Sequence, residues 1–223
     1  MPRRLVADDR RGKKLMSHDN QVKVWDPVVR VFYWTLVVAF FAAYFITDDD
    51  FLWLHSWAGY LILALVALRI IWGFVGTRHA RFANFVTEPS ESLRYLSEEI
   101  TGRASRYLGH NPAGAAMVIA ILVFLLLATL SGIVLYAADD GTGPLAGWIA
   151  KSETLAAPLE DIHELFANLT LALVIVHTGG VLLSSVTHRE NLMALMFHGY
   201  KRREDAPGSP SAEVQGEDVR GDA

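Results

Sequence analysis

Three of the eight histidines lie inside long apolar segments, where an ionisable side chain is costly and indicates a functional site. They are His55, His163 and His177. His163 and His177 are 14 residues apart, so in one α-helix both rings project from the same face, about 21 Å apart along the axis. His55 lies near the start of its own apolar segment, and an antiparallel arrangement of the segments puts it at the depth of His163.

Imidazoles from facing helices have a specific use at such a depth. Two neutral imidazoles can hold the iron of one planar haem, one from each side. A metal site without haem is less favoured, because no cluster of Asp, Glu or Cys accompanies the histidines. The alternative role for His163 is that of a polar residue at the start of a helix, whereas His177 lies deeper in its segment. The histidine pattern therefore predicts haem binding between helices.

Further candidate residues are expected at the same depth in the membrane as His177. Arg69 is 14 residues after His55, so it shares the helix face of that histidine at the depth of His177. An arginine there can pair with a haem propionate, or its side chain can extend to the membrane surface. Tyr33, on the first apolar segment, is expected at the same depth. Gly59 follows His55 by four residues and would let a flat macrocycle approach the helix backbone, although glycines serve helix packing at least as often.

Four long apolar segments must position these side chains, namely residues 28–47, 51–76, 113–138 and 162–186. Each is long enough for a transmembrane helix, which needs about 20 apolar residues. Four buried helices of a soluble protein would leave too little of the 223 residues to cover them. The sequence therefore predicts an all-α, integral membrane four-helix bundle. The absence of cysteine excludes disulfides, iron–sulfur clusters and covalently attached c-type haem.

Basic residues decide the orientation of this bundle. Residues 1–30 contain eight Lys and Arg, the stretch between the second and third apolar segments contains five, and the stretch after the fourth contains five. The two remaining loops contain only Lys151. The positive-inside rule therefore places both termini and the middle loop in the cytoplasm. We expect no cleavable signal peptide, because the first 30 residues are charged. The net charge of −4 argues against a nucleic-acid partner.

The chain divides into a basic cytoplasmic segment, a four-helix membrane domain and a polar tail that we expect to be disordered. These parts cover residues 1–27, 28–203 and 204–223. In the middle cytoplasmic loop, Leu93, Leu96 and Ile100 at helical spacing predict a short surface helix. The outer loop, residues 139–160, could hold a short interfacial segment.

Several short motifs occur in a recognisable order along the chain. They are VWDPVVRVFYW, LHSWAGY, RIIWGFVGTRHARFANFV, HNPAG, NLTLALVIVH, SSVTHRENL and HGYKRR, and they span about residues 22–203. In this order the motifs resemble the bacterial cytochrome b561 / nickel–iron hydrogenase b-type cytochrome subunit family. The resemblance implies a four-helix membrane protein that holds two b-type haems.

The resemblance also implies the haem ligands. The outer haem would be held by His55 and His163, and the inner haem by His177 and a histidine of the first span. That last histidine usually stands in an R-x-x-H-W setting, whereas this chain reads RVFYW, with Tyr33 in the ligand position. Three outcomes are open: Tyr33 ligates the inner iron as phenolate, His177 alone ligates it, or the inner haem is weakly held or absent. We expect a retained but altered inner haem, because His177 and Arg69 are both present.

A protein of this family is expected to transfer electrons between a periplasmic partner and quinone in the bacterial inner membrane. The periplasmic partner would be a cytochrome c or an oxidoreductase subunit. Whether the chain is itself a quinone oxidoreductase subunit stays open. Three rival functions also stay open: a membrane anchor for a periplasmic oxidoreductase, a haem-based sensor of a small ligand that uses an inner haem altered by Tyr33, and a proton or ion transporter that uses the histidines.

Quinone would enter from the membrane lipid, and a few residues are candidates for contact with it. Trp53, Trp57 and Trp72 could lie beside it, although tryptophans of this kind also form interfacial belts. Proton-coupled quinone chemistry needs a nearby acid or base, and Glu164, next to His163, is one candidate. The preferred interpretation of Glu164 is instead a favourable charge in the first turn of its helix.

Overall fold

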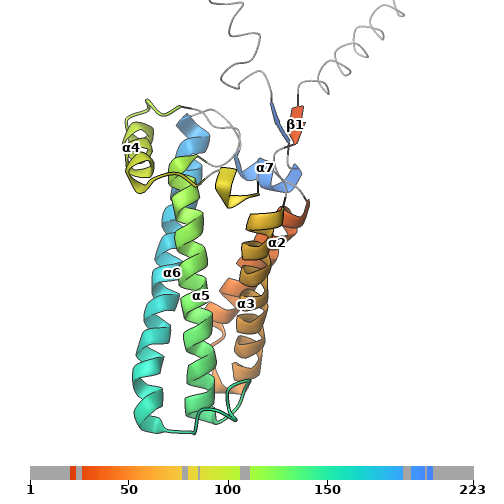
Figure 1. The fold of residues 1–223 in the computed structure, drawn as a ribbon, viewed down its shortest axis with the longest axis vertical. Coiled ribbons are helices and arrows are strands. Elements are labelled where there is room, and N and C mark those ends of the chain that lie inside the picture. Colours follow the sequence, from red (N-terminus) through yellow and green to blue (C-terminus); the bar gives the residue numbers. More distant parts are fainter. Residues whose placement is uncertain are drawn as a thin grey trace, which may run out of the picture.

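The computed structural model describes residues 21–23, 27–76, 80–84, 86–105, 111–187, 192–198 and 200–202. Four long helices dominate this part of the chain and run side by side (Figure 1). They are α2 (Pro27–Phe45), α3 (Leu52–Val75), α5 (Pro112–Asp140) and α6 (Glu153–Thr187). All four are long and apolar enough to cross a membrane, α3 together with the short 3₁₀ helix η1 (Asp49–Phe51) that precedes it. The predicted helical membrane bundle is confirmed.

An apolar core joins α2, α3 and α5. It consists of Phe32, Leu36, Ala39 and Phe40 from α2, Ile62 and Val66 from α3, and Val118, Leu122 and Leu125 from α5. Leu171 from α6 packs against this core. Many other large apolar side chains project outward, for example Val38, Phe74 and Val186, which are 68%, 70% and 77% exposed. Because so much exposed apolar surface is unfavourable in water, these side chains indicate contact with lipid.

Local sequence signals explain where the third span begins and ends. The side chain of Asn111 accepts a hydrogen bond from the backbone N–H of Gly114, and Pro112 occupies the first turn of α5. At the other end Gly141 has a φ of +68°, a left-handed conformation that glycine adopts without strain. The N–H of Gly141 bonds to the carbonyl of Ala137, as in common helix C-terminal motifs.

The fourth span begins earlier than the apolar pattern predicts. Helix α6 starts at Glu153 rather than at residue 162, so the outer loop is residues 141–152 instead of 139–160. With 35 residues the helix is about 52 Å long, against a hydrocarbon core of about 30 Å, so its polar first turns can project beyond the membrane. His163 and Glu164 therefore lie about three turns inside the helix. The alternative of a helix-start role for His163 and the first-turn interpretation of Glu164 are wrong.

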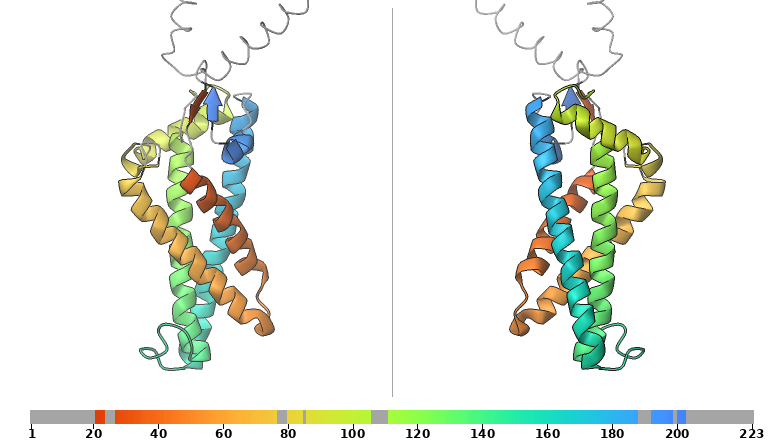
Figure 2. Two further views of the ribbon diagram at one scale, coloured as in Figure 1. Left: turned by 90° about the vertical axis from the view of Figure 1, so that its right-hand side faces the viewer. Right: turned by 90° about the vertical axis from the view of Figure 1, so that its left-hand side faces the viewer.

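Smaller elements gather at one end of the bundle (Figure 2). The predicted surface helix is present as α4 (Pro89–Ile100), and the hydroxyl group of Ser92 donates to the carbonyl of Pro112 at the start of α5. Helix α4 turns Tyr95 inward, whereas Leu93 and Ile100 are 68% and 69% exposed. A short 3₁₀ helix, η2 (Phe82–Asn84), precedes α4.

The segment before the first span and the segment after the fourth span contact each other, and we call this group of contacts the clasp. Helix α7 (Leu192–His198) follows α6, and strand β1 (Gln21–Lys23) pairs antiparallel with strand β2 (Tyr200–Arg202). Arg30 at the start of α2 donates to the backbone carbonyl of Phe197, and the rings of Trp34 and Phe197 are 4.7 Å apart. The clasp connects the start of the first span to the chain that follows the fourth.

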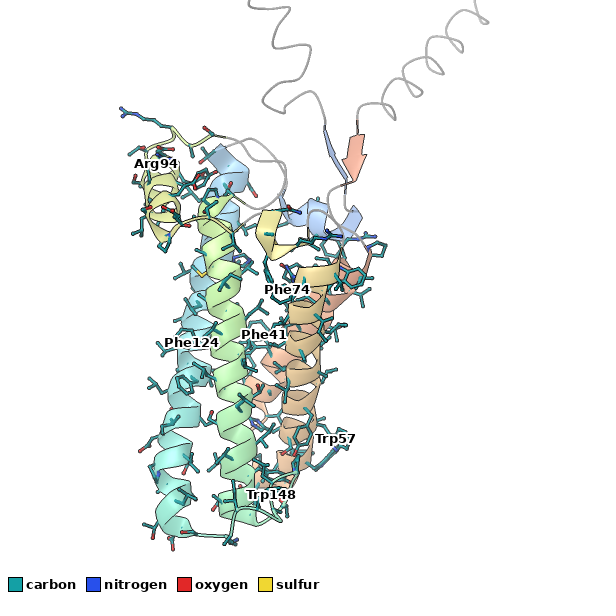
Figure 3. The ribbon with its side chains drawn as sticks, viewed as in Figure 1. Phe41, Trp57, Phe74, Arg94, Phe124 and Trp148 are labelled. Atoms are coloured by element: carbon teal, nitrogen blue, oxygen red, sulfur yellow. The ribbon has the colours of Figure 1, made fainter. Side chains whose placement is uncertain are left out.

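Individual side chains mark the two ends of the bundle. Trp57 and Trp148 lie at the end of the bundle that carries the α5–α6 loop, and Arg94 lies with α4 at the opposite end (Figure 3). The positive-inside rule predicts that the end with α4 is the cytoplasmic one, and this orientation stays a prediction. Most of the predicted basic segment, residues 1–27, and all of the predicted tail, residues 204–223, lie outside the described residues.

Candidate functional site

Two of the predicted ligands face each other at the outer end of the bundle. His55 comes from the start of α3 and His163 from α6, and the centres of their rings are 5.9 Å apart, with 76° between the ring planes. Both side chains are partly buried. The structure thus brings the two histidines together, as the depth argument expects, and their role as iron ligands stays a prediction.

The separation of the rings suits two axial ligands of one metal ion. A metal–nitrogen bond of about 2.0 Å on each side, plus about 1.1 Å from each nitrogen to the centre of its ring, separates the two centres by about 6.2 Å. The observed separation of 5.9 Å is close to this value. Edge-to-face packing of two aromatic rings without a metal also gives centre separations of about 4.5–7 Å. The hydrogen bonds of the rings must therefore distinguish a pair of metal ligands from simple ring packing.

The ring of His55 is held by the end of α2. Its Nδ1 atom lies 2.9 Å from the carbonyl oxygen of Ala43 and 3.2 Å from that of Ile46. The last carbonyl groups of an α-helix have no partner within the helix, and α2 ends at Phe45. His55 therefore provides a hydrogen-bond donor for the carbonyl groups at the end of α2. A carbonyl oxygen only accepts hydrogen bonds, so Nδ1 of His55 carries the proton.

The ring of His163 is seated against α5. Its Nδ1 atom lies 2.9 Å from the carbonyl oxygen of Ala128 and 3.4 Å from the hydroxyl oxygen of Ser131. By the same reasoning Nδ1 of His163 carries the proton and donates it to the carbonyl of Ala128. Gly132 lies directly against this ring, because a side-chain carbon there would stand 2.8 Å from Cε1 of His163.

In their neutral form both rings would therefore carry the proton on Nδ1 and have Nε2 free of a proton. Metal-binding histidines adopt this arrangement, in which the second ring nitrogen donates to a carbonyl or carboxylate and so fixes the tautomer and orientation of the ring. Two neutral imidazoles from different helices are a donor set that suits haem iron. Within the described ranges, no group of three or more His, Cys, Asp or Glu could hold a metal ion without haem.

A cavity of about 290 Å³ lies beside the histidine pair. Apolar side chains from three helices line much of it, among them Phe40, Ile62 and Leu125. Gly59 also lines it, and a side-chain carbon placed on Gly59 would meet no atom within 4 Å. The volume lies just below the range of small-molecule pockets, which is about 300–1,000 Å³. Open space over Gly59 is what its predicted role beside a flat cofactor requires.

The outer end of the cavity is polar and acidic. Tyr60 and Tyr136 border it together with Asp139 and Glu160. Gly143 in the outer loop has a φ of +87°, and a side-chain carbon there would stand 2.8 Å from the ring of Tyr136. The outer loop therefore packs closely on the cavity only with glycine at this position.

Glu164 belongs to a separate hydrogen-bonded chain between α2 and α6. The hydroxyl group of Tyr44, which lines the cavity, donates to Asn168 over 2.7 Å. The amide of Asn168 donates in turn to the carboxylate of Glu164 over 3.3 Å. Hydrogen bonds of this kind hold membrane helices together, so this chain supports the contact of α2 with α6 beside the site.

The predicted inner residues lie apart from this pair. Arg69 is only 2% exposed, its guanidinium group lies 4.9 Å from the centre of the Phe82 ring, and its charge and a side-chain hydrogen bond act on the hydroxyl group of Tyr33. His177 is half-buried on α6. Among the described residues no hydrogen bond or ring contact joins Tyr33 to His177, so their pairing across one iron stays a prediction.

Sequence reasoning missed the residues that orient the histidines. Ser131 and Gly132 are adjacent inside an apolar segment without charges, and this Ser-Gly pair was the sequence feature that could have indicated a contact with a histidine. The carbonyls of Ala43 and Ala128 carry no signal at all, because every residue has a backbone carbonyl.

Comparisons with known proteins match this chain along most of its length. The family model described as prokaryotic cytochrome b561 matches residues 24–199. A curated relative named probable Ni/Fe-hydrogenase B-type cytochrome subunit, from Rhizobium leguminosarum bv. viciae, is 25% identical over 90% of this chain and 98% of its own length. Proteins of the same name from Rhodobacter capsulatus and Azotobacter vinelandii are 25% and 26% identical, over 91% and 87% of this chain and 90% and 94% of their own lengths. No solved structure matches the chain significantly.

Proposed function

We propose, from the premise that the chain belongs to the prokaryotic cytochrome b561 family, that it transfers electrons between a periplasmic redox partner and membrane quinone through haem held at the His55–His163 pair. The chain is a multi-pass membrane b-type cytochrome of electron transfer, as its family and its four apolar helices indicate. The identity of the partner, the use of quinone and the location in the bacterial inner membrane are the finer parts of this proposal.

The observation that carries the proposal is the pair of matched ring orientations. His55 and His163 come from different helices, lie 5.9 Å apart, and each donates Nδ1–H to a backbone carbonyl. Two such rings would hold haem iron from both sides and leave it no open position, which suits electron transfer rather than oxygen chemistry. A bound haem would supply reversible one-electron redox chemistry, and apolar side chains form much of the cavity wall beside the pair.

The inner residues support a second, altered haem site in the proposal. His177 would be one ligand and the Tyr33 oxygen the other, and Arg69 would steady that oxygen. The side chain of Arg69 interacts with the hydroxyl group of Tyr33, so a positive charge would stand beside the oxygen at the inner site. This arrangement would make the inner site differ from the outer one in both spectrum and potential.

The proposed periplasmic partner is an oxidoreductase subunit or a cytochrome c. Relatives named as Ni/Fe-hydrogenase B-type cytochrome subunits support a redox enzyme in this role. Acidic side chains border the outer end of the cavity, so a partner with a basic docking surface would be attracted there. They are Asp49, Asp139, Asp140 and Glu160. Quinone would reach the site from lipid beside Trp53 and Trp57, which are 58% and 66% exposed.

Gly59→Val is expected to weaken haem binding without harming the apoprotein. A side-chain carbon at this position meets no protein atom within 4 Å, and the valine side chain would enter the space beside the histidine pair, where it would collide with a macrocycle. Overpacking of this kind costs about 1–3 kcal/mol, or about 5- to 150-fold in the haem dissociation constant. Haem titration of the apoprotein measures this dissociation constant. Gly147→Val, at another glycine with open surroundings, is the control, and equal haem affinity in the two variants would remove Gly59 from the site.

The proposal is tested on protein purified from haem-replete bacterial membranes. It predicts a b-type reduced-minus-oxidised spectrum, about two haems per chain, and reduction of the haem by a water-soluble quinol analogue under anaerobic conditions. If the quinol analogue cannot reduce the haem, whatever the number of haems per chain, the proposed use of quinone would be contradicted. A protein that binds its redox partner equally well after haem is lost would be an anchor subunit, and a protein without haem would contradict the proposal as a whole.

A further inference from the structure

Gly132 and the ring of His163 occupy adjoining space where α5 meets α6. A side-chain carbon at Gly132 would stand 2.8 Å from Cε1 and 3.0 Å from Nδ1 of His163. Non-bonded carbon atoms in contact lie about 3.5–4.0 Å apart, so the ring and a methyl group cannot both hold these positions. The position of the ring therefore depends on the absence of a side chain at Gly132.

The backbone beside Gly132 provides the hydrogen bond that orients the ring. Ala128 precedes Gly132 by four residues, so its carbonyl belongs to the hydrogen-bond ladder of α5. The same carbonyl accepts Nδ1–H of His163 over 2.9 Å and the hydroxyl group of Ser131 over 3.0 Å. Side chains of the next helical turn shield a backbone carbonyl in the middle of a helix. A side chain from another helix can therefore reach such a carbonyl only where the next turn leaves it exposed. Gly132 is in that next turn.

We propose that Gly132 is a positioning residue for the iron ligand His163. The notch it leaves in α5 seats the ring against the carbonyl of Ala128, keeps the proton on Nδ1 and leaves Nε2 for the iron. This inference rests on the proposed haem-binding function of the His55–His163 pair. Gly132 itself would need no contact with the iron, so its effect would pass entirely through the ring.

The first test is Gly132→Ala, with Gly147→Ala as the matched control. The ring of His163 is the end of a side chain and can turn away from the new methyl group, so the fold should survive while the ligand is displaced. Loss of a residue that orients a metal ligand typically weakens metal binding about 10- to 100-fold, and we expect at least a tenfold rise in the haem dissociation constant. Part of the ferric spectrum should change from low-spin to high-spin, and added imidazole should restore it. Gly147→Ala should behave as wild type, because its new methyl group meets no atom.

A double-mutant cycle separates positioning from ordinary helix packing. In a His163→Ala background the ring is gone, so Gly132→Ala should leave the haem dissociation constant unchanged and should not lower the unfolding midpoint. An equal effect of Gly132→Ala with and without the ring would assign Gly132 to packing of α5 on α6 and overturn the inference. If Gly132→Ala alone does not accumulate as folded protein, the double variant decides: accumulation at the level of His163→Ala supports the inference, and failure to accumulate overturns it.

The same measurements distinguish this inference from the function on which it rests. Wild-type protein that binds haem through His163, together with a Gly132→Ala variant of wild-type spectrum and affinity, would overturn the positioning role alone. Wild-type protein that binds no haem would overturn both.

Discussion

Replacing His163 with alanine is expected to weaken haem binding by more than about 100-fold and to remove the low-spin spectrum of the outer haem. Loss of a residue that only supports a metal ligand costs about 10- to 100-fold in affinity, and this substitution removes the ligand itself. The apoprotein should lose only about 1 kcal/mol, because one hydrogen bond disappears and the carbonyl of Ala128 keeps the hydroxyl group of Ser131. Haem titration and chemical unfolding of the apoprotein measure the two effects separately.

The corresponding change at His55 should differ in its effect on stability. His55→Ala should lose the haem as well, but it also removes the donor to the carbonyls of Ala43 and Ile46 at the end of α2, at a cost of about 1–3 kcal/mol. His198→Ala, in α7 at the other end of the bundle, is the control and should keep its haem. A folded His163→Ala protein with an unchanged low-spin spectrum would show that another residue ligates the outer iron.

Replacing Tyr33 with histidine is expected to convert the inner haem to a six-coordinate low-spin form and to raise its reduction potential by on the order of 0.1 V. A phenolate ligand favours ferric iron, whereas an imidazole leaves the reduced form more accessible. Tyr33 is the proposed oxygen ligand because it stands in the ligand position of the RVFYW motif, and the buried Arg69 interacts with its hydroxyl group. A spectroelectrochemical titration of wild type and variant measures the change.

Tyr33→Phe serves as the control for this experiment. Tyr33 packs against the apolar core, and phenylalanine keeps that ring while it removes the oxygen. We expect a folded protein whose inner haem has lost its oxygen ligand and binds carbon monoxide more readily when reduced. If neither substitution changes the spectrum, the depth argument has assigned the wrong residue to the inner iron. A ratio near one haem per chain in the wild type would contradict a retained inner haem.

Much of the fold was predictable from the sequence, for reasons that particular segments make clear. Membrane thickness sets a minimum length for apolar helices, and residues 113–138 meet it without a single charge. The convergence of His55 and His163 followed from helix rise and antiparallel order, because both quantities are fixed by geometry. The surface helix α4 was visible in the spacing of its leucines.

Other features depend on contacts that the sequence pattern does not contain. Helix α6 continues to Glu153 through a segment that contains Pro158 and the charged residues Glu160 and Asp161, so an uninterrupted apolar pattern could not find its start. The hydrogen bond of His163 depends on the crossing point of α6 on α5, and the pairing of Arg69 with Tyr33 depends on the contact of α2 with α3. The β1–β2 pair joins segments almost 180 residues apart in sequence, beyond the reach of local signals.

The ligand set of the iron in the wild-type protein tests the central claim most directly. Electron paramagnetic resonance of the ferric protein should show a low-spin signal, strongly anisotropic because the ring planes of His55 and His163 lie 76° apart. This signal should disappear when either histidine is replaced by alanine. A low-spin signal that survives both replacements, or a colourless protein from haem-replete cells, would contradict the claim that these two imidazoles hold haem between the helices.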